Sequence, residues 1–269
     1  MRLIIAAALA ATIAATMLAS CTDAQQPAPP EETASYSAAT YAAAIADSRR
    51  PQADTDRDAA RMPGELLAFA QIDSGEAVGD YIMGGGYLTR LLAGAVGEQG
   101  KVYAFQPTEF IAFRADYASE QDTAVAPYPG LVVPLRAAIA APGFPEPLDT
   151  IITAQNLHDL FIGPMPAGTS DAAIKALYDA LKPGGVLVVV DHRAVAGSGA
   201  AAADSVHRMD EALARAALTS AGFVLEATSE LYAQPDDPRT ANVFDPAIRG
   251  ATDQFLWRLR KPETANGAE

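Results

Sequence analysis

Short apolar segments alternate with amphipathic ones over most of this chain, and this alternation is what most constrains its fold. Leu88, Leu91, Leu92 and Ala95 are spaced i, i+3, i+4, i+7, as on one face of a helix. The segments with strand character are residues 77–82, 101–105, 131–135, 150–154, 186–190, 223–231 and 254–259. Strand–helix–strand units with almost wholly apolar strands predict a sheet covered by helices on both faces. We therefore expect an α/β fold: a three-layer, doubly wound domain around a mostly parallel seven-stranded sheet.

The helices between these strands are predicted from their apolar faces. Residues 41–45 and 59–72 are predicted to form two helices that cap the domain, separated by a charged turn at 49–57. A further helix is expected at 206–216, after a loop rich in glycine and alanine. Thr108 is expected to cap a helix that carries three aromatic residues on one face, Phe110, Phe113 and Tyr117.

The first twenty residues differ in kind from the rest. Arg2 is followed by an uncharged apolar run, Leu3–Met17. This run is short for a membrane-spanning helix, which needs about 20 residues, and is typical of a cleaved export signal. The sequence Leu-Ala-Ser-Cys at 18–21 resembles the bacterial lipoprotein box. We expect a lipoprotein signal peptide at 1–20 and lipidation of Cys21; an ordinary signal peptide with an incidental cysteine is the alternative.

The remaining organisation follows from composition. Residues 22–35 are rich in Pro, Gln and Glu without apolar periodicity, which predicts a flexible tether over residues 21–38. Residues 39–262 are expected to form the folded domain and 263–269 a disordered tail. Cys21 is the only cysteine, so no disulfide can form within the chain. The protein is expected to be exported and lipid-anchored to a bacterial membrane, with its domain facing the periplasm.

The formal net charge of −14 restricts the partners. Nucleic-acid binding depends on a basic surface that displaces counterions, so the charge argues against it. It also disfavours adsorption to anionic lipid headgroups, which leaves the lipid anchor as the expected membrane contact. A small-molecule partner fits this composition. The oligomeric state does not follow from the sequence.

Ligands of parallel α/β sheets bind beyond the carboxyl ends of the strands, where the strand order reverses. This rule directs attention to residues 84–87, Gln106, 155–159 and 191–193. Three consecutive glycines at 84–86 lie between a strand and a helix, where glycine lets a ligand approach the backbone closely. A tight turn without a ligand is the alternative interpretation.

This glycine turn and its surroundings resemble a known family. Asp80-x-x-x-Gly-Gly-Gly-Tyr-Leu-Thr, followed by residues 96–104, resembles the first two motifs of class I S-adenosylmethionine (SAM) methyltransferases. Residues 181–187, Leu-Lys-Pro-Gly-Gly-Val-Leu, resemble the turn before the fifth strand of that family. The resemblance spans residues 75–260. Four further segments are similar to an uncharacterised group of bacterial predicted methyltransferases: Gln155–Asp159, Asp191-His192, His207–Asp210 and Phe244–Gly250.

The resemblance implies a Rossmann-like methyltransferase fold and SAM-dependent methyl transfer to a small-molecule acceptor. Three features depart from the family pattern. The acid or amide that often contacts adenine after the third strand has no clear counterpart near residues 136–138. Ile82 replaces the first glycine of the loop, and Gln106 replaces the acid that ends the second strand and holds the ribose hydroxyls. The SAM-binding residues that the resemblance implies are Asp80, Gly84, Gly85, Gly86, Tyr87, Gln106, Gln155 and Asn156.

Acid–base groups gather after the fourth and fifth strands. An acceptor hydroxyl or protonated amine needs a base, and histidine is the commonest one. We expect His158 and His192 to be catalytic together with Asp159, and Asp191, His207 and Arg249 to contact the substrate or form a lid. The alternative for each histidine is a structural bond to a loop carbonyl. The alternative to a lid at residues 245–250 is a simple turn that packs the last strand. The clustering of histidine and aspartate also permits a metal site. Because no two histidines have a metal-ligand spacing on one element, we do not expect a metal.

Two other functions remain open. A binding lipoprotein that has kept the fold and lost its activity would explain Ile82 and Gln106, and SAM is made in the cytosol rather than the periplasm. A nicotinamide-dependent oxidoreductase is disfavoured because the loop lacks the spacing Gly-x-Gly-x-x-Gly and no acid ends the second strand. The methyl acceptor does not follow from the sequence.

Overall fold

The computed structural model describes residues 36–263. Contacts divide the chain into residues 1–33 and 34–269, and only the second unit contains described residues. The expected signal peptide, Cys21 and residues 264–269 lie outside them. No helix in the described range combines the length and apolar character needed to cross a membrane. Tyr36 already packs on the domain, because its hydroxyl donates a hydrogen bond to Asp73 Oδ2 at 2.7 Å. The folded part therefore begins earlier than the expected residue 39.

Seven strands form a single sheet in the order β3-β2-β1-β4-β5-β7-β6. The first five strands pair in parallel, and β7 runs antiparallel to both β5 and β6. The expected fold class, a mostly parallel seven-stranded sheet with flanking helices, is confirmed. The strands are β1 (Ala77–Tyr81), β2 (Lys101–Pro107), β3 (Val132–Ala137), β4 (Leu148–Ala154), β5 (Leu181–His192), β6 (Val224–Ser229) and β7 (Gln254–Arg260).

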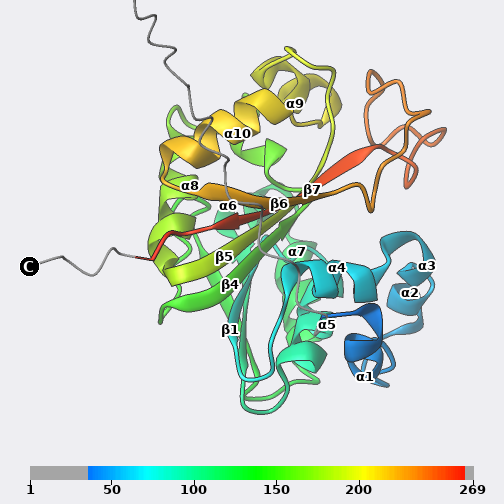
Figure 1. Ribbon diagram of the computed structural model, residues 1–269, viewed down its shortest axis with the longest axis vertical. Helices are drawn as coiled ribbons and strands as arrows, with labels where there is room; N and C mark the ends of the chain where they lie inside the picture. Colours follow the sequence, from blue (N-terminus) through cyan, green and yellow to red (C-terminus); the bar gives the residue numbers. More distant parts are fainter. Residues whose placement is uncertain (1–35, 264–269) are drawn as a thin grey trace, which may run out of the picture. The chain divides into compact units, whose positions relative to one another are not determined.

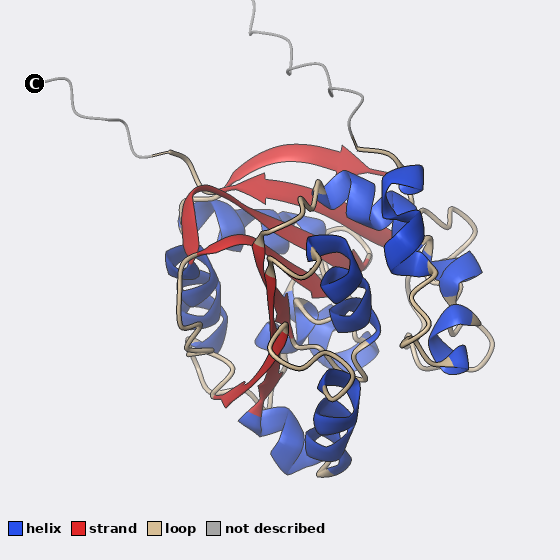
Figure 2. Ribbon diagram, turned by 90° about the horizontal axis from the view of Figure 1, so that it is seen from below, coloured by secondary structure: helices blue, strands red, loops and turns tan. Residues whose placement is uncertain are grey.

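Helices cover both faces of this sheet (Figures 1 and 2). One face carries the N-terminal elements: η1 (Ala38–Tyr41), α1 (Ala42–Ile45), α2 (Gln52–Thr55), α3 (Asp58–Arg61), α4 (Pro63–Ala70), α5 (Tyr87–Val96) and α7 (Asp116–Val125). The remaining elements are α6 (Thr108–Phe113), η2 (His158–Phe161), α8 (Thr169–Ala180), α9 (Ala200–Val206) and α10 (Glu211–Ser220).

The central strand β5 shows how the two cores are separated. Val186, Val188 and Val190 belong to the core beneath α4 and α5, whereas Leu187 and Val189 belong to the core beneath α8 and α10. Successive side chains of a strand point to opposite faces, so an uninterrupted apolar strand is buried on both sides. This strand fixes the middle of the domain.

Two predicted helices are broken by residues in the left-handed conformation. The expected helix 59–72 is divided into α3 and α4 at Met62, with φ of 40°, directly before Pro63. The expected turn at 49–57 contains the short helix α2. The expected helix 206–216 is divided at His207, with φ of 53°, so that α9 ends at Val206 and α10 begins at Glu211. Local backbone geometry at these positions overrides the apolar period.

The aromatic face predicted after Thr108 was wrong. Phe113 is 90% exposed, and α6 ends there because Arg114 is extended. Tyr117 belongs to the separate helix α7. Thr108 is the first residue of α6 and makes no capping hydrogen bond. Spacing alone could not show that the chain leaves the helix between these aromatic residues.

At the amino edge of the sheet, Glu76 is held in a setting that favours its neutral form. Burial, followed by the charge of nearby Asp149, raises the pKa of Glu76 to about 7. The folded protein therefore holds this proton more tightly than the unfolded chain, and the free energy of unfolding falls as pH rises from about 4.5 towards 7.

Glu76→Gln is expected to raise the free energy of unfolding at pH 8 by about 1–2 kcal/mol, allowing for solvent screening, and to leave it unchanged near pH 4.5. Urea unfolding of the full chain at both pH values measures this. The matched control is Glu98→Gln, because Glu98 is an exposed loop acid. A stabilisation that is equal at both pH values would contradict the assignment.

Candidate functional site

The carboxyl ends of β1, β4 and β5 meet where the strand order reverses, because β1 lies between β2 and β4. Asn156 joins two of these ends: its Nδ2 donates to Ile82 O at 3.1 Å and to Ala154 O at 2.7 Å. Gln155 is tied to the neighbouring strands, since its Nε2 donates to Gln254 Oε1 at 3.0 Å. Segments that are distant in sequence therefore form one polar edge.

Ile82, at the end of β1, has a φ of 64° and a side chain only 4% exposed. This left-handed conformation is a clear outlier for a β-branched residue, and such strain costs about 1–3 kcal/mol. The backbone conformation is one that glycine adopts freely. The left-handed backbone at Ile82 explains why the family resemblance implies a glycine where this chain has isoleucine.

The three glycines of the turn have different surroundings. Apart from its own residue and its chain neighbours, a Cβ atom on Gly84 or Gly85 would have no heavy atom of residues 36–263 within 4 Å. A Cβ atom on Gly86 would lie 2.5 Å from the Ala124 side chain. Gly86 also has a φ of 81°. Gly86 is therefore required for packing and turn geometry, while Gly84 and Gly85 present open backbone.

Two buried polar side chains, Asp80 and Gln106, support this turn. Asp80 is fully buried and accepts a hydrogen bond from Thr89 Oγ1 at 2.5 Å, which links β1 to α5; burial raises the pKa of Asp80 to about 6. Gln106 is also fully buried, and its Oε1 accepts from Gly84 N at 3.1 Å. Within residues 36–263 the Nε2 of Gln106 has no hydrogen-bond partner. An unsatisfied buried donor of this kind costs about 1–3 kcal/mol.

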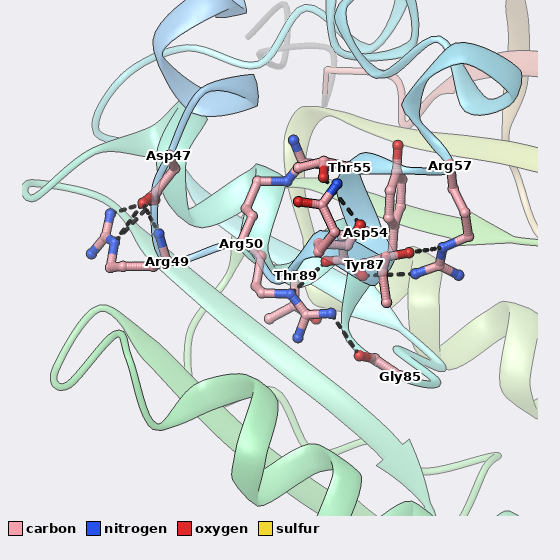
Figure 3. A network of polar contacts seen from close by, with 12 residues as sticks. Asp47, Arg49, Arg50, Asp54, Thr55, Arg57, Gly85, Tyr87 and Thr89 are labelled. Carbon is pink, nitrogen blue, oxygen red and sulfur yellow. Dashed lines mark hydrogen bonds and ion pairs between the residues drawn. The ribbon is translucent and has the colours of Figure 1, made fainter.

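An ion-pair network from the N-terminal helices braces the same turn (Figure 3). Arg90 donates from Nε to Asp54 Oδ2 at 2.6 Å and from Nη2 to Gly85 O at 2.9 Å. Asp54 also pairs with Arg57 at 2.7 Å. The Tyr87 hydroxyl donates to Asp58 Oδ1 at 2.7 Å. Helices α2 and α3 thereby fix the start of α5, which the sequence interpretation as a charged turn had missed.

A second polar group surrounds Asp191, at the end of β5. This fully buried carboxylate accepts from the backbone N–H groups of His158 and His192, both at 2.7 Å, and pairs with His158 Nδ1 at 2.8 Å. The ring of His158 lies 6.1 Å from that of His192 and 5.6 Å from that of His207. The predicted convergence of these loops is observed, and Asp191 is the residue that organises them.

The histidines of this group differ in their protonation. Burial opposes a charged imidazolium at His158, but the carboxylate of Asp191 outweighs it and raises the pKa of His158 to about 9. Burial lowers the pKa of His192 to about 4, and it also lowers the pKa of His207. Burial raises the pKa of Asp159 to about 6. His158 therefore carries a proton at neutral pH, whereas His192 is neutral.

A cavity of about 380 Å³ opens beyond the ends of β4 and β5. It lies between the N-terminal helices and the loop that precedes β7, coloured orange in Figure 1. Four of the predicted site residues line it: Tyr87, Gln155, His192 and Arg249. Asp191 and His158 are buried and do not line this cavity.

Arg61 also lines the cavity, and sequence reasoning did not single it out. Its guanidinium lies 4.8 Å from the centre of the Tyr87 ring, and burial lowers its pKa. No carboxylate within residues 36–263 pairs with it; the cavity therefore offers a positive charge to a ligand. The only available signal was its position in a segment of alternating arginine and aspartate.

No protein-family model and no curated protein sequence matches this chain. Solved structures share its fold. A SAM-dependent methyltransferase from Aquifex aeolicus has a TM-score of 0.55 at 19% identity, with 81% of this chain and 96% of that chain covered. An arsenic(III) S-adenosylmethionine methyltransferase from Chlamydomonas reinhardtii has a TM-score of 0.52 at 16% identity, covering 86% and 75%. The N-methyltransferase NodS from Bradyrhizobium japonicum WM9 has a TM-score of 0.51 at 16% identity, covering 77% and 97%. The fold of this chain is thus that of SAM-dependent methyltransferases.

Proposed function

We propose that this chain is a SAM-dependent methyltransferase that acts on a small-molecule acceptor. The observation that carries the proposal is the open backbone of Gly84 and Gly85 beside the unpaired buried amide of Gln106. Ribose hydroxyls of a ligand on this backbone would be acceptors for Gln106 Nε2 once the amide turns out of the buried position it has here. The residues present therefore fit SAM, although the usual acid is absent.

When bound, SAM supplies a methyl group that is already activated on a sulfonium. The task of the chain is to align an acceptor with that methyl group, and such positioning is worth several kcal/mol. Gly84 and Gly85 would hold the cofactor, and the cavity beyond β4 and β5 would hold the acceptor. Tyr87 and Gln155 line the cavity and would form the boundary between the two.

His192 is the histidine best placed to take a proton from the acceptor, because it lines the cavity. Its Nδ1 lies 2.8 Å from Thr252 Oγ1, a hydrogen bond that orients the ring and leaves Nε2 for the acceptor. His158 is less suited, because its Nδ1 is paired with Asp191 and it does not line the cavity. Arg61 and Arg249 would favour an acceptor that carries an acidic group.

The two other functions differ in support. The classic dinucleotide-binding sheet has the order 3-2-1-4-5-6, whereas here the antiparallel strand β7 lies between β5 and β6. Both this strand order and the methyltransferase fold of the structural neighbours argue against a nicotinamide enzyme. A protein that has kept the fold without the activity would fail to bind SAM, which the following experiment measures.

Gly85→Val is expected to weaken SAM binding at least tenfold while the melting temperature stays unchanged. The new side chain enters open space at a backbone position without positive φ, and this is the space assigned to the cofactor. Calorimetry of the full chain with SAM provides the measurement. In the matched variant Gly86→Ala, the melting temperature should fall, because Cβ collides with Ala124. Equal SAM affinity in wild type and Gly85→Val would remove the glycine turn from the site, and a wild type without SAM binding would refute the proposal.

His192→Gln is expected to lower methyl transfer by about 10²–10⁴-fold, the usual contribution of an acid–base group, with SAM affinity retained. Transfer of a radiolabelled methyl group to a panel of acidic and neutral small molecules identifies a working acceptor for this measurement. Unchanged turnover in His192→Gln would exclude His192 as the base.

Arg61→Gln should raise KM for acidic acceptors more than for neutral ones.

We further propose that the protein is exported and anchored by a lipid on Cys21, as its Leu-Ala-Ser-Cys segment indicates. Acyl-chain burial contributes about 0.8 kcal/mol per CH₂, so several chains on one cysteine hold firmly. Cys21→Ser is expected to abolish incorporation of radiolabelled palmitate and to leave unprocessed or mislocalised protein. A variant that still fractionates with membranes at the mature size would contradict this anchor.

A further inference from the structure

Three side chains with metal-binding atoms gather between the loop after β4 and the break between α9 and α10. His158 and Asp159 come from η2, and His207 comes from the break. One ligand atom of each lies within 4.8 Å of the other two. Ligands of a zinc ion at about 2.1 Å are at most about 4.2 Å apart. A small rotation of the half-buried His207 ring therefore closes the distance.

The orientation of His158 suits a ligand. Its Nδ1 is held by the buried carboxylate of Asp191 at 2.8 Å, which leaves Nε2 pointing away from Asp191. Nε2 lies 3.5 Å from Asp159 Oδ1. Metal-binding histidines commonly donate their second N–H to a carboxylate in this way, which fixes the ring and strengthens the ligand.

Within residues 36–263, the side chains of Asp159 and His207 have no hydrogen-bond partner. The side chain of Asp159 is only 14% exposed, yet its carboxylate accepts no hydrogen bond from any residue within 36–263. Its Oδ1 lies 3.5 Å from His158 Nε2. No hydrogen bond inside the same range engages the ring of His207. A largely buried carboxylate without donors is costly, and a cation would satisfy it.

We propose that His158, Asp159 and His207 bind one divalent transition-metal ion, with Asp191 orienting His158 from behind. Two imidazoles and one carboxylate favour zinc or iron over magnesium and calcium, which prefer oxygen ligands. Three protein ligands leave a coordination position open for water or another oxygen ligand. His207 also packs against Phe244, which lines the cavity, with ring centres 4.9 Å apart. The metal site thus adjoins the cavity, but its existence does not depend on methyl transfer.

Calorimetric titration with zinc tests the site directly. The full chain carries Cys21→Ser, which removes the only thiol, and no polyhistidine tag. We expect one zinc ion per chain, with millimolar magnesium unable to displace it. His207→Asn should weaken zinc binding at least 100-fold, because asparagine tolerates the left-handed backbone but removes the imidazole. Asp159→Asn should also weaken it.

The matched control is His192→Asn, the same substitution at the neighbouring histidine outside the ligand set. It should change zinc affinity by less than threefold, and thermal unfolding with a chelator present checks that every variant is folded. Equal zinc affinity in wild type and His207→Asn overturns the proposal. So do equal losses in His207→Asn and His192→Asn, or displacement of zinc by magnesium at comparable concentration. Because zinc binding is read without SAM, its failure is distinguishable from failure of the methyltransferase proposal.

Discussion

The reversal of strand order between β1 and β4 is the constraint on which the rest of the site depends. Parallel strands on both sides of this point deliver their carboxyl ends to one edge. Each end leaves polar backbone groups that need partners. Asn156 meets this need by donating to both Ile82 O and Ala154 O. The glycine turn and the loops after β4 and β5 are adjacent because the strands that precede them are neighbours and run in parallel.

A buried ion pair then gives the turn its rigidity. Arg90 and Asp54 are both almost fully buried and pair at 2.6 Å. Breaking such a pair typically costs 3–5 kcal/mol, because one charge remains buried without compensation. Arg90 also bonds Gly85 O, so the N-terminal helices act on the backbone next to the proposed cofactor. Through Arg90, the N-terminal helices hold the open, glycine-rich turn in place.

The sequence was sufficient for features set by long apolar periods and insufficient for those set by single residues. The valines of β5 predict a strand buried on both faces, and Gly97 predicts the end of α5, where its φ is 67°. The break at Met62 had a signal that the apolar period obscured, because Pro63 disfavours the helical conformation at the residue before it. The break at His207 has no such signal, because left-handed backbone at this non-glycine residue follows from tertiary packing. For the site, the convergence of 155–159 and 191–192 was predictable from topology. The charge of Arg61, which pairs with no carboxylate among residues 36–263, was not predictable, because pairing depends on which acids lie near it in space.

Asp191 shows how one buried carboxylate can assign different roles to two histidines. It pairs with the ring of His158 but accepts only the backbone N–H of His192. The ring of His158 is therefore held charged and fixed, whereas the ring of His192 is left neutral and turned to Thr252 and the cavity. An imidazole whose Nδ1 is held by a buried carboxylate presents Nε2 in a fixed direction, which suits a metal ligand. A neutral imidazole at a cavity wall suits proton transfer. The ends of β4 and β5 thus bring together two chemically different imidazoles, whose ring centres lie 6.1 Å apart.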